Sequence, residues 1–160
     1  MIKNESGMNF ILDNYSYIME DDTFYKKMSS KFGTKDVDFI IKREKKLLFV
    51  EAKTSSPQEL EDYVTEIVTK FIDSLFIFTG IILKRKNTQP SIITSEMDKL
   101  SHLKGSVQLV LIIKNAEKSH LRPIRDLLQN KLRKIIQMYS LESSVIVMNE
   151  SQSKIKKFVQ

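Results

Sequence analysis

Residues 47–50, Leu-Leu-Phe-Val, form a continuous apolar run that leaves no polar face. A strand of this kind is buried on both sides of a sheet, whereas a strand with one face in water alternates apolar and polar residues. Covering both faces requires helices or further strands, and 160 residues are enough to supply them around one core. The run therefore favours a single α/β domain, which we assign to residues 1–150.

The segment before this run completes a β-hairpin. Residues 36–42 are rich in β-branched and aromatic side chains, and a polar break follows at residues 43–46. A connection centred in the break places Asp38 directly opposite Glu51. Side chains of directly opposed residues share one face of the sheet, with Cβ atoms about 5 Å apart.

The opposed carboxylates point to metal chemistry. Asp38 and Glu51 repel each other in this position, and a divalent cation between them reverses the sign of that interaction. Oxygen ligands of this kind suit Mg²⁺ or Mn²⁺. Lys53 lies two residues after Glu51 and so projects from the same face, where its ammonium group can stabilise charge on a phosphate. An ordinary ion pair at the end of a strand is the alternative explanation.

Helical signals follow the hairpin. Ser56 as N-cap, a proline after it and Glu59 as the third helical residue form a capping box, which predicts a helix over residues 57–82. Its second half, residues 71–78, is apolar nearly all round. Such a helix is buried or pairs with another chain, so this half is also a candidate dimer surface.

The remaining elements are expected to complete a mixed sheet. The predictions are a short helix at residues 8–12, strands at residues 15–19, 107–113 and 145–148, a helix over residues 121–139, and a mobile C-terminal tail over residues 151–160. The hairpin, helix, strand, helix and strand follow one another in an order typical of α/β proteins. A polar connection at residues 84–105 is a candidate region for substrate recognition.

The spacing of Asp38 and the run Glu51-Ala52-Lys53 resembles the signature of the PD-(D/E)xK nuclease superfamily, which has the restriction-endonuclease-like fold. The resemblance implies an αβββαβ core with a mixed central sheet flanked by helices. It also implies that Asp38, Glu51 and the carbonyl of Ala52 bind the metal and that Lys53 is catalytic. The implied activity is that of an Mg²⁺-dependent nuclease, most simply a DNA endonuclease of restriction, phage defence or repair.

Two further residues are assigned to the site on this resemblance. Members of the superfamily often add an acidic residue from the first core helix and a Lys or Gln from the helix after E-x-K. Glu20 and Lys70 are the candidates here, and Lys70 interrupts an otherwise apolar helix half. The alternatives are a solvated turn for Glu20 and a buried pair of Lys70 with Asp73. The sequence departs from the family at Val37, where many members have proline, and no Q-x-x-x-Y motif follows on the helix.

Composition limits the kinds of partner and of site that the chain can have. The formal net charge of +6 is compatible with a nucleic acid partner, DNA in the nuclease interpretation. The absence of cysteine excludes disulfides and thiolate metal sites. The first residues hold no apolar run typical of a signal peptide, and no segment is long enough to span a membrane, so we expect a cytoplasmic protein.

Two other functions remain open at this stage. The same fold can serve as a non-catalytic module that binds nucleic acid or protein. It can also be a nuclease subunit that is active only with a partner. A metal ion held by Asp38 and Glu51 stabilises the folded chain. A nuclease should therefore gain thermal stability from metal, and a non-catalytic module should not.

Overall fold

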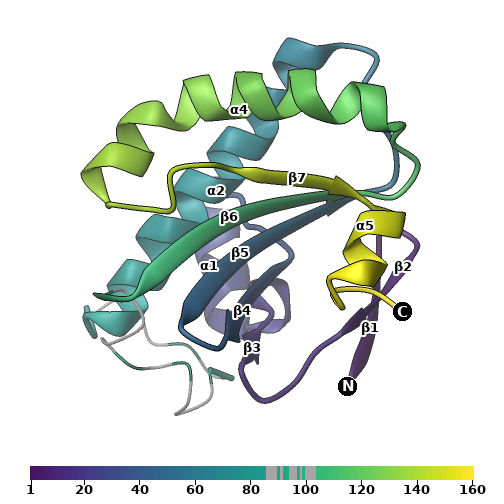
Figure 1. Ribbon diagram of the computed structural model, residues 1–160. Coiled ribbons are helices and arrows are strands. Elements are labelled where there is room, and N and C mark those ends of the chain that lie inside the picture. Colours follow the sequence, from purple (N-terminus) through teal and green to yellow (C-terminus); the bar gives the residue numbers. More distant parts are fainter. Residues whose placement is uncertain (86–89, 91, 94–96, 98, 100–103) are drawn as a thin grey trace.

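The computed structural model describes residues 1–85, 90, 92, 93, 97, 99 and 104–160. A five-stranded sheet runs through the centre of the molecule in the order β3-β4-β5-β6-β7 (Figure 1). Its strands are β3 (Ser16–Tyr17), β4 (Phe39–Arg43), β5 (Lys46–Lys53), β6 (Ser106–Ile113) and β7 (Ile146–Asn149). The pairs β3–β4 and β4–β5 are antiparallel, and the pairs β5–β6 and β6–β7 are parallel. The predicted mixed sheet is therefore confirmed.

The register of the hairpin agrees with the sequence prediction. In the antiparallel pair β4–β5, Phe39 lies opposite Val50 and Arg43 lies opposite Lys46. The turn between them consists of Glu44 and Lys45, and Glu44 has a left-handed φ of 52° although neither residue is glycine or asparagine. Extended by one residue, this register sets Asp38 against Glu51.

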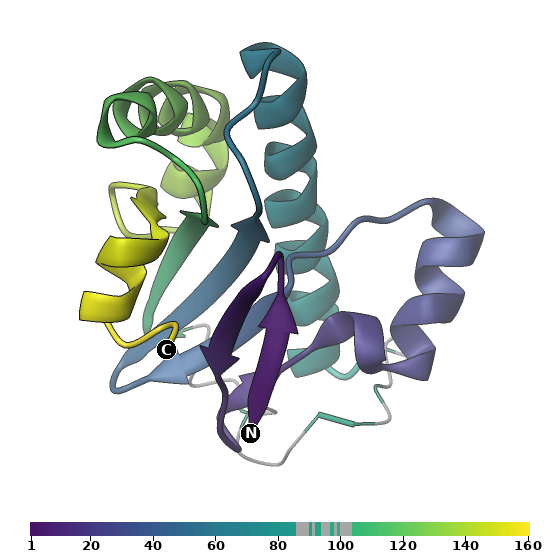
Figure 2. The ribbon, with the colours of Figure 1, turned by 90° about the vertical axis from the view of Figure 1, so that its right-hand side faces the viewer.

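Two hydrophobic clusters cover the two faces of the sheet. Alternate residues of β5 divide between them, with Leu47 and Phe49 on one face and Leu48 and Val50 on the other. Helices α2 (Leu60–Ile82) and α4 (Lys118–Met138) pack on the first face. A two-stranded hairpin, β1 (Ile2–Glu5) and β2 (Met8–Ile11), packs on the second with the C-terminal segment (Figures 1 and 2). The apolar run of β5 is thus buried on both sides, as expected.

The order of elements differs from the expected αβββαβ core. The short strand β3 comes first, then the 3₁₀ turn η1 (Met19–Asp21) and helix α1 (Thr23–Phe32), and only then β4 and β5. Helix α1 is therefore inserted between the first and second strands of the sheet instead of preceding all of them. Asp22 caps α1 by accepting a hydrogen bond from the Phe24 N–H, a local signal that the sequence prediction did not use. The structure is α/β with a mixed sheet.

The N-terminal prediction of a short helix was wrong. Met8, Phe10 and Leu12 are buried while the residues between them are exposed, which is the two-residue period of a strand. The hairpin β1–β2 turns at Ser6 and Gly7, both with positive φ (51° and 72°). Five consecutive residues were too few for sequence periodicity to separate a strand from a helix.

The start of α2 also differs from the prediction. The helix begins at Leu60, its N-cap is Glu59 without a side-chain cap, and the Ser56 hydroxyl is buried without a hydrogen-bond partner. The predicted capping box is therefore not formed. The end at Ile82 is as expected, and most of residues 71–78 pack into the chain's own core, with Phe76 left exposed. This packing explains the apolar helix half without a second chain.

Helix α4 and strand β6 lie close to their predicted positions. The buried residues of α4 are three or four positions apart, as in an amphipathic helix: Leu121, Ile124, Leu128, Leu132 and Ile136. Most of the connection at 84–105 lies outside the described residues. Within the part of the chain that is described, no helix is long and apolar enough to cross a membrane.

The C-terminus was expected to be a mobile tail, and the structure corrects this. Residues Glu150–Ile155 form helix α5, which begins with a capping box between Asn149 and Gln152. Phe158 and Val159 are buried in the second cluster, and Val159 forms a β-bridge with Phe10. The prediction missed these contacts because two apolar residues in a polar segment have no periodicity, and their burial depends on β1–β2.

Candidate active site

The ends of β4 and β5 bring Asp38 and Glu51 together. Asp38 directly precedes β4, and its Oδ2 accepts a hydrogen bond of 2.6 Å from the backbone N–H of Ala52. Both side chains project on the α2 face, because they share the alternation of Ile40 and Phe49. The opposition predicted from the hairpin register is therefore present.

Glu51 is the most buried charged group of the site, with 0% of the residue exposed. Its Oε1 accepts a hydrogen bond of 2.7 Å from the Lys70 ammonium and lies 3.3 Å from the Lys53 ammonium. Its Oε2 is buried and has no hydrogen-bond partner. Two lysines thus contact one oxygen of the carboxylate, and the other oxygen accepts no hydrogen bond. Lys70 lies in the site, where the sequence expected it.

Lys53 connects this buried group to the surface. Its ammonium lies 2.8 Å from Glu66 Oε1, closer than it lies to Glu51. Glu66 was not predicted as a site residue. The available signal was its position four residues before Lys70, which sets both on one side of α2. Tyr63, one turn earlier, has a buried hydroxyl without a hydrogen-bond partner. Burial raises the pKa of Tyr63, and the charge of Glu51 adds to the rise.

The electrostatics of the two carboxyl groups follow from burial. Removal from water raises the pKa of Asp38 to about 8, and the charge of Glu51 adds to the rise, while the Ala52 N–H and Lys70 oppose it. Burial also raises the pKa of Glu51, against the lowering effect of Lys70 and Lys53. Two carboxylates that are costly to ionise therefore lie side by side, and a bound cation would remove that cost.

The N-terminal hairpin closes one side of the site. Ser6 Oγ donates a hydrogen bond of 3.1 Å to the Ala52 carbonyl, and Lys114, just after β6, donates one of 2.8 Å to the Gly7 carbonyl. The tip of the hairpin lies near the end of β5 (Figure 2). The charge of Glu5, at this tip, contributes to the raised pKa of Asp38. Sequence reasoning missed Glu5, because nothing in the local pattern links residue 5 to residue 38.

Glu20 is not brought into the site. It lies in η1, its side chain is half-exposed, and it pairs with Lys3 at 3.3 Å. None of its described contacts reaches Asp38, Glu51 or Lys53. The reason is the insertion of η1 and α1 after β3, which turns the acidic segment toward β1. The predicted catalytic role of Glu20 has no geometric support.

The donor set available for a metal ion is small. Among the described residues, no group of three or more His, Cys, Asp or Glu side chains is arranged to hold a metal ion. Asp38, Glu51 and the Ala52 carbonyl remain as the expected ligands, and the unpartnered Glu51 Oε2 fits such a role. A hard cation accepts carboxylate and carbonyl oxygens together and completes its shell with water.

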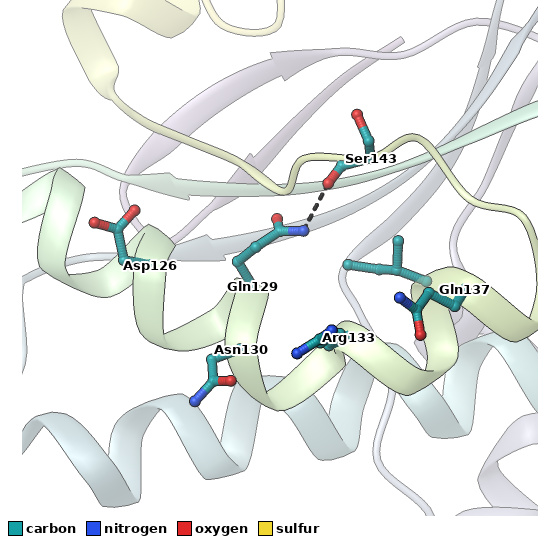
Figure 3. Close-up of a pocket in the computed structure, with 7 residues that line it drawn as sticks. Asp126, Gln129, Asn130, Arg133, Gln137 and Ser143 are labelled. Atoms are coloured by element: carbon teal, nitrogen blue, oxygen red, sulfur yellow. Dashed lines mark hydrogen bonds between the residues drawn. The ribbon is translucent and has the colours of Figure 1, made fainter.

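A groove lies elsewhere on the molecule. It has a volume of about 530 Å³ and lies along the second half of α4, near the connection to β7 (Figure 3). Gln129 spans it and donates a hydrogen bond of 2.6 Å to the Ser143 carbonyl. The groove is lined by Asp126, Gln129, Asn130, Arg133, Ile136, Gln137 and Ser143. It is at the edge where β6 begins, whereas Asp38 and Glu51 lie where β5 ends, so groove and site are separate.

Comparisons of the chain with protein-family models, curated proteins and solved structures found no match.

Proposed function

We propose that this chain is a metal-dependent nuclease, with Asp38 and Glu51 as ligands of Mg²⁺ or Mn²⁺ and Lys53 as the catalytic cation. The observation that carries the proposal is the state of Glu51. The carboxylate is fully buried, two lysines share one of its oxygens, and the other oxygen has no partner. Buried polar atoms are nearly always satisfied, so an orphaned carboxylate oxygen beside a second carboxyl group fits the role of a cation ligand.

The lysines have different parts in this proposal. Lys70 contacts Glu51 at 2.7 Å, and its charge lowers the pKa that burial raises, so it favours the ionised form that a metal needs. Lys53 is 22% exposed and lies between Glu51 and solvent. Its ammonium is thus able to meet a phosphate group and stabilise the charge that builds up during attack. A divalent ion, when bound, would polarise a phosphoryl oxygen and lower the pKa of water.

DNA is the proposed substrate. The net charge of +6 favours a polyanion, and metal-assisted hydrolysis acts on phosphodiester bonds. One site per chain cuts one strand at a time, so cutting both strands requires two successive nicks or a homodimer. Restriction, phage defence and repair are the contexts suggested by analogy with the resembling superfamily.

The test is cleavage of a supercoiled plasmid and of a labelled single strand with Mg²⁺, with Mn²⁺ and with chelator. Wild type is compared with Asp38→Asn and Lys53→Ala. The matched control is Asp126→Asn, the same change at an exposed position of α4. We expect metal-dependent cutting by wild type and control, and a rate lower by about 10²- to 10³-fold in the two site variants. Cutting that survives both site substitutions would refute the assignment.

Metal-induced thermal stabilisation separates the remaining functions when wild type does not cut. Metal at 100 times its dissociation constant stabilises the folded state by about 2.7 kcal/mol. Stabilisation of wild type that Asp38→Asn abolishes would identify a subunit that needs a partner for cleavage. A chain that neither cuts nor gains stability from metal would be a non-catalytic module, and the charged cluster would then be a structural ion network.

A further inference from the structure

The ammonium of Lys53 lies between two carboxylates that differ in exposure. Glu51 is fully buried, Lys53 is 22% exposed, and the Glu66 side chain is 41% exposed. Together with Lys70, these groups form a chain of alternating charge from the interior to the surface, joined by contacts of 2.7, 3.3 and 2.8 Å. Of these four residues, only Lys53 has a carboxylate on both its buried and its exposed side.

The two carboxylates hold Lys53 unequally. Glu51 offers Lys53 the oxygen that it also shares with Lys70, at the longer distance of 3.3 Å. A cation bound at Glu51 would add positive charge beside Lys53 and weaken this contact further, because like charges repel at short range. Glu66 is then the acceptor that remains. A lysine has a flexible four-carbon stem, so without an acceptor its ammonium is free to leave the site.

Glu66 is well placed to act as a fixed acceptor. It belongs to α2, and its neighbours Val64, Ile67 and Phe71 are buried against the sheet, so the helix has little freedom to move. The hydrogen bond from Lys53 is the main cause that lowers the pKa of Glu66, and the charges of Lys53, Lys70 and Lys35 act in the same direction. The carboxylate is therefore ionised at neutral pH.

We infer that Glu66 is a positioning residue, whose ion pair with Lys53 fixes the catalytic ammonium at the mouth of the site. The inference rests on the proposed nuclease function. It assigns to α2 a second contribution besides Lys70, from a residue that holds no metal and touches no phosphate. Positioning of this kind acts on the rate of the chemical step, because misplacing a catalytic group by about 1 Å can cost about 10²-fold.

The experiment measures kcat and KM for metal-dependent cleavage by wild type, Glu66→Ala, Glu66→Gln and Glu61→Ala. Glu61 is the matched control: it lies on the same helix, is exposed and pairs with Lys131 at 2.8 Å. We expect Glu66→Ala to lower kcat by roughly tenfold to a hundredfold with KM changed little. Glu66→Gln should recover part of kcat, because its amide oxygen still accepts from Lys53. Glu61→Ala should cut at the wild-type rate.

Thermal stabilisation by Mg²⁺ is recorded for every variant and should be the same in Glu66→Ala as in wild type. Equal kcat in Glu66→Ala and Glu61→Ala would overturn the inference and leave the nuclease function standing. Loss of Mg²⁺ stabilisation in Glu66→Ala would overturn it as well, because Glu66 would then act on metal binding. A wild type that neither cuts nor gains stability from Mg²⁺ would refute the nuclease function and this inference together.

Discussion

Asp38 and Glu51 are held where each hinders ionisation of the other. The Ala52 N–H binds Asp38, and Lys70 and Lys53 bind Glu51, yet the pKa of both carboxyl groups is raised because burial outweighs these contacts. Such a pair destabilises the metal-free protein when both groups are charged. Clusters of this kind are more common at functional sites than in structural cores.

This state predicts how stability depends on pH without metal. The pKa of Asp38 is about 8 in the folded chain and about 3.9 in an unfolded one. Between these values the folded state keeps a proton that the unfolded state has lost, so the free energy of unfolding falls as pH rises from about 4 to about 8. The raised pKa of Glu51 acts in the same direction.

Replacing the carboxyl group should remove much of this dependence. We expect Asp38→Asn, which keeps an acceptor for the Ala52 N–H, to show a smaller fall in Tm between pH 5 and pH 8 than wild type. Each kcal/mol of relieved repulsion corresponds to about 2–4 °C for a chain of this size. Thermal unfolding in the presence of chelator measures Tm against pH, and parallel curves for the two proteins would contradict the raised pKa of Asp38.

Helices α2 and α5 differ in how they begin. The Ser-Pro-Gln-Glu segment at residues 56–59 has the pattern of a capping box, yet α2 begins after it, without a side-chain cap. At α5, by contrast, the Asn149 side chain accepts from the Gln152 N–H, and the Gln152 side chain accepts from the Asn149 N–H. A capping pattern marks a position where a helix can begin. The packing of the turns that follow decides whether the helix begins there.

The two potential caps should respond differently to substitution. Asn149→Ala should destabilise the protein by about 1–2 kcal/mol, because it removes the cap of α5 and the bond from Nδ2 to the Ala116 carbonyl. Ser56→Ala should change stability by less than about 0.5 kcal/mol, because its hydroxyl has no partner to lose. Urea unfolding measures both, and a larger loss for Ser56→Ala than for Asn149→Ala would contradict the structure.

At the scale of the whole molecule, the chain ends complete the second face of the sheet. Arg43 of β4 donates hydrogen bonds to the Lys156 and Lys157 carbonyls and stacks 4.1 Å from the Phe158 ring centre. The N-terminal hairpin lies on the same face and reaches Ala52 through Ser6. The two ends of the chain thus cover the second face of the sheet together, and the N-terminal hairpin also reaches the end of β5.

Removing the last five residues should therefore have a large effect. Deletion of residues 156–160 exposes the surfaces covered by Phe158 and Val159, at about 1.5–3 kcal/mol for each side chain. We expect a clear fall in the urea midpoint. The control Ile155→Ala removes an apolar side chain that is 82% exposed, and should leave the midpoint unchanged. An unaffected truncation would restore the interpretation of this segment as a mobile tail.

The sequence by itself determined the class of fold, the hairpin register and the opposition of Asp38 and Glu51, because strand alternation and a short turn leave few arrangements. The resemblance to the nuclease superfamily also pointed to Lys70, which interrupts an apolar helix half. Only the tertiary structure decided that Glu66 joins the site, that the charge of Glu5 acts on Asp38, that Glu20 stays outside the site, and that residues 150–159 pack against the sheet. These positions depend on contacts between segments far apart in the chain, which no local pattern encodes.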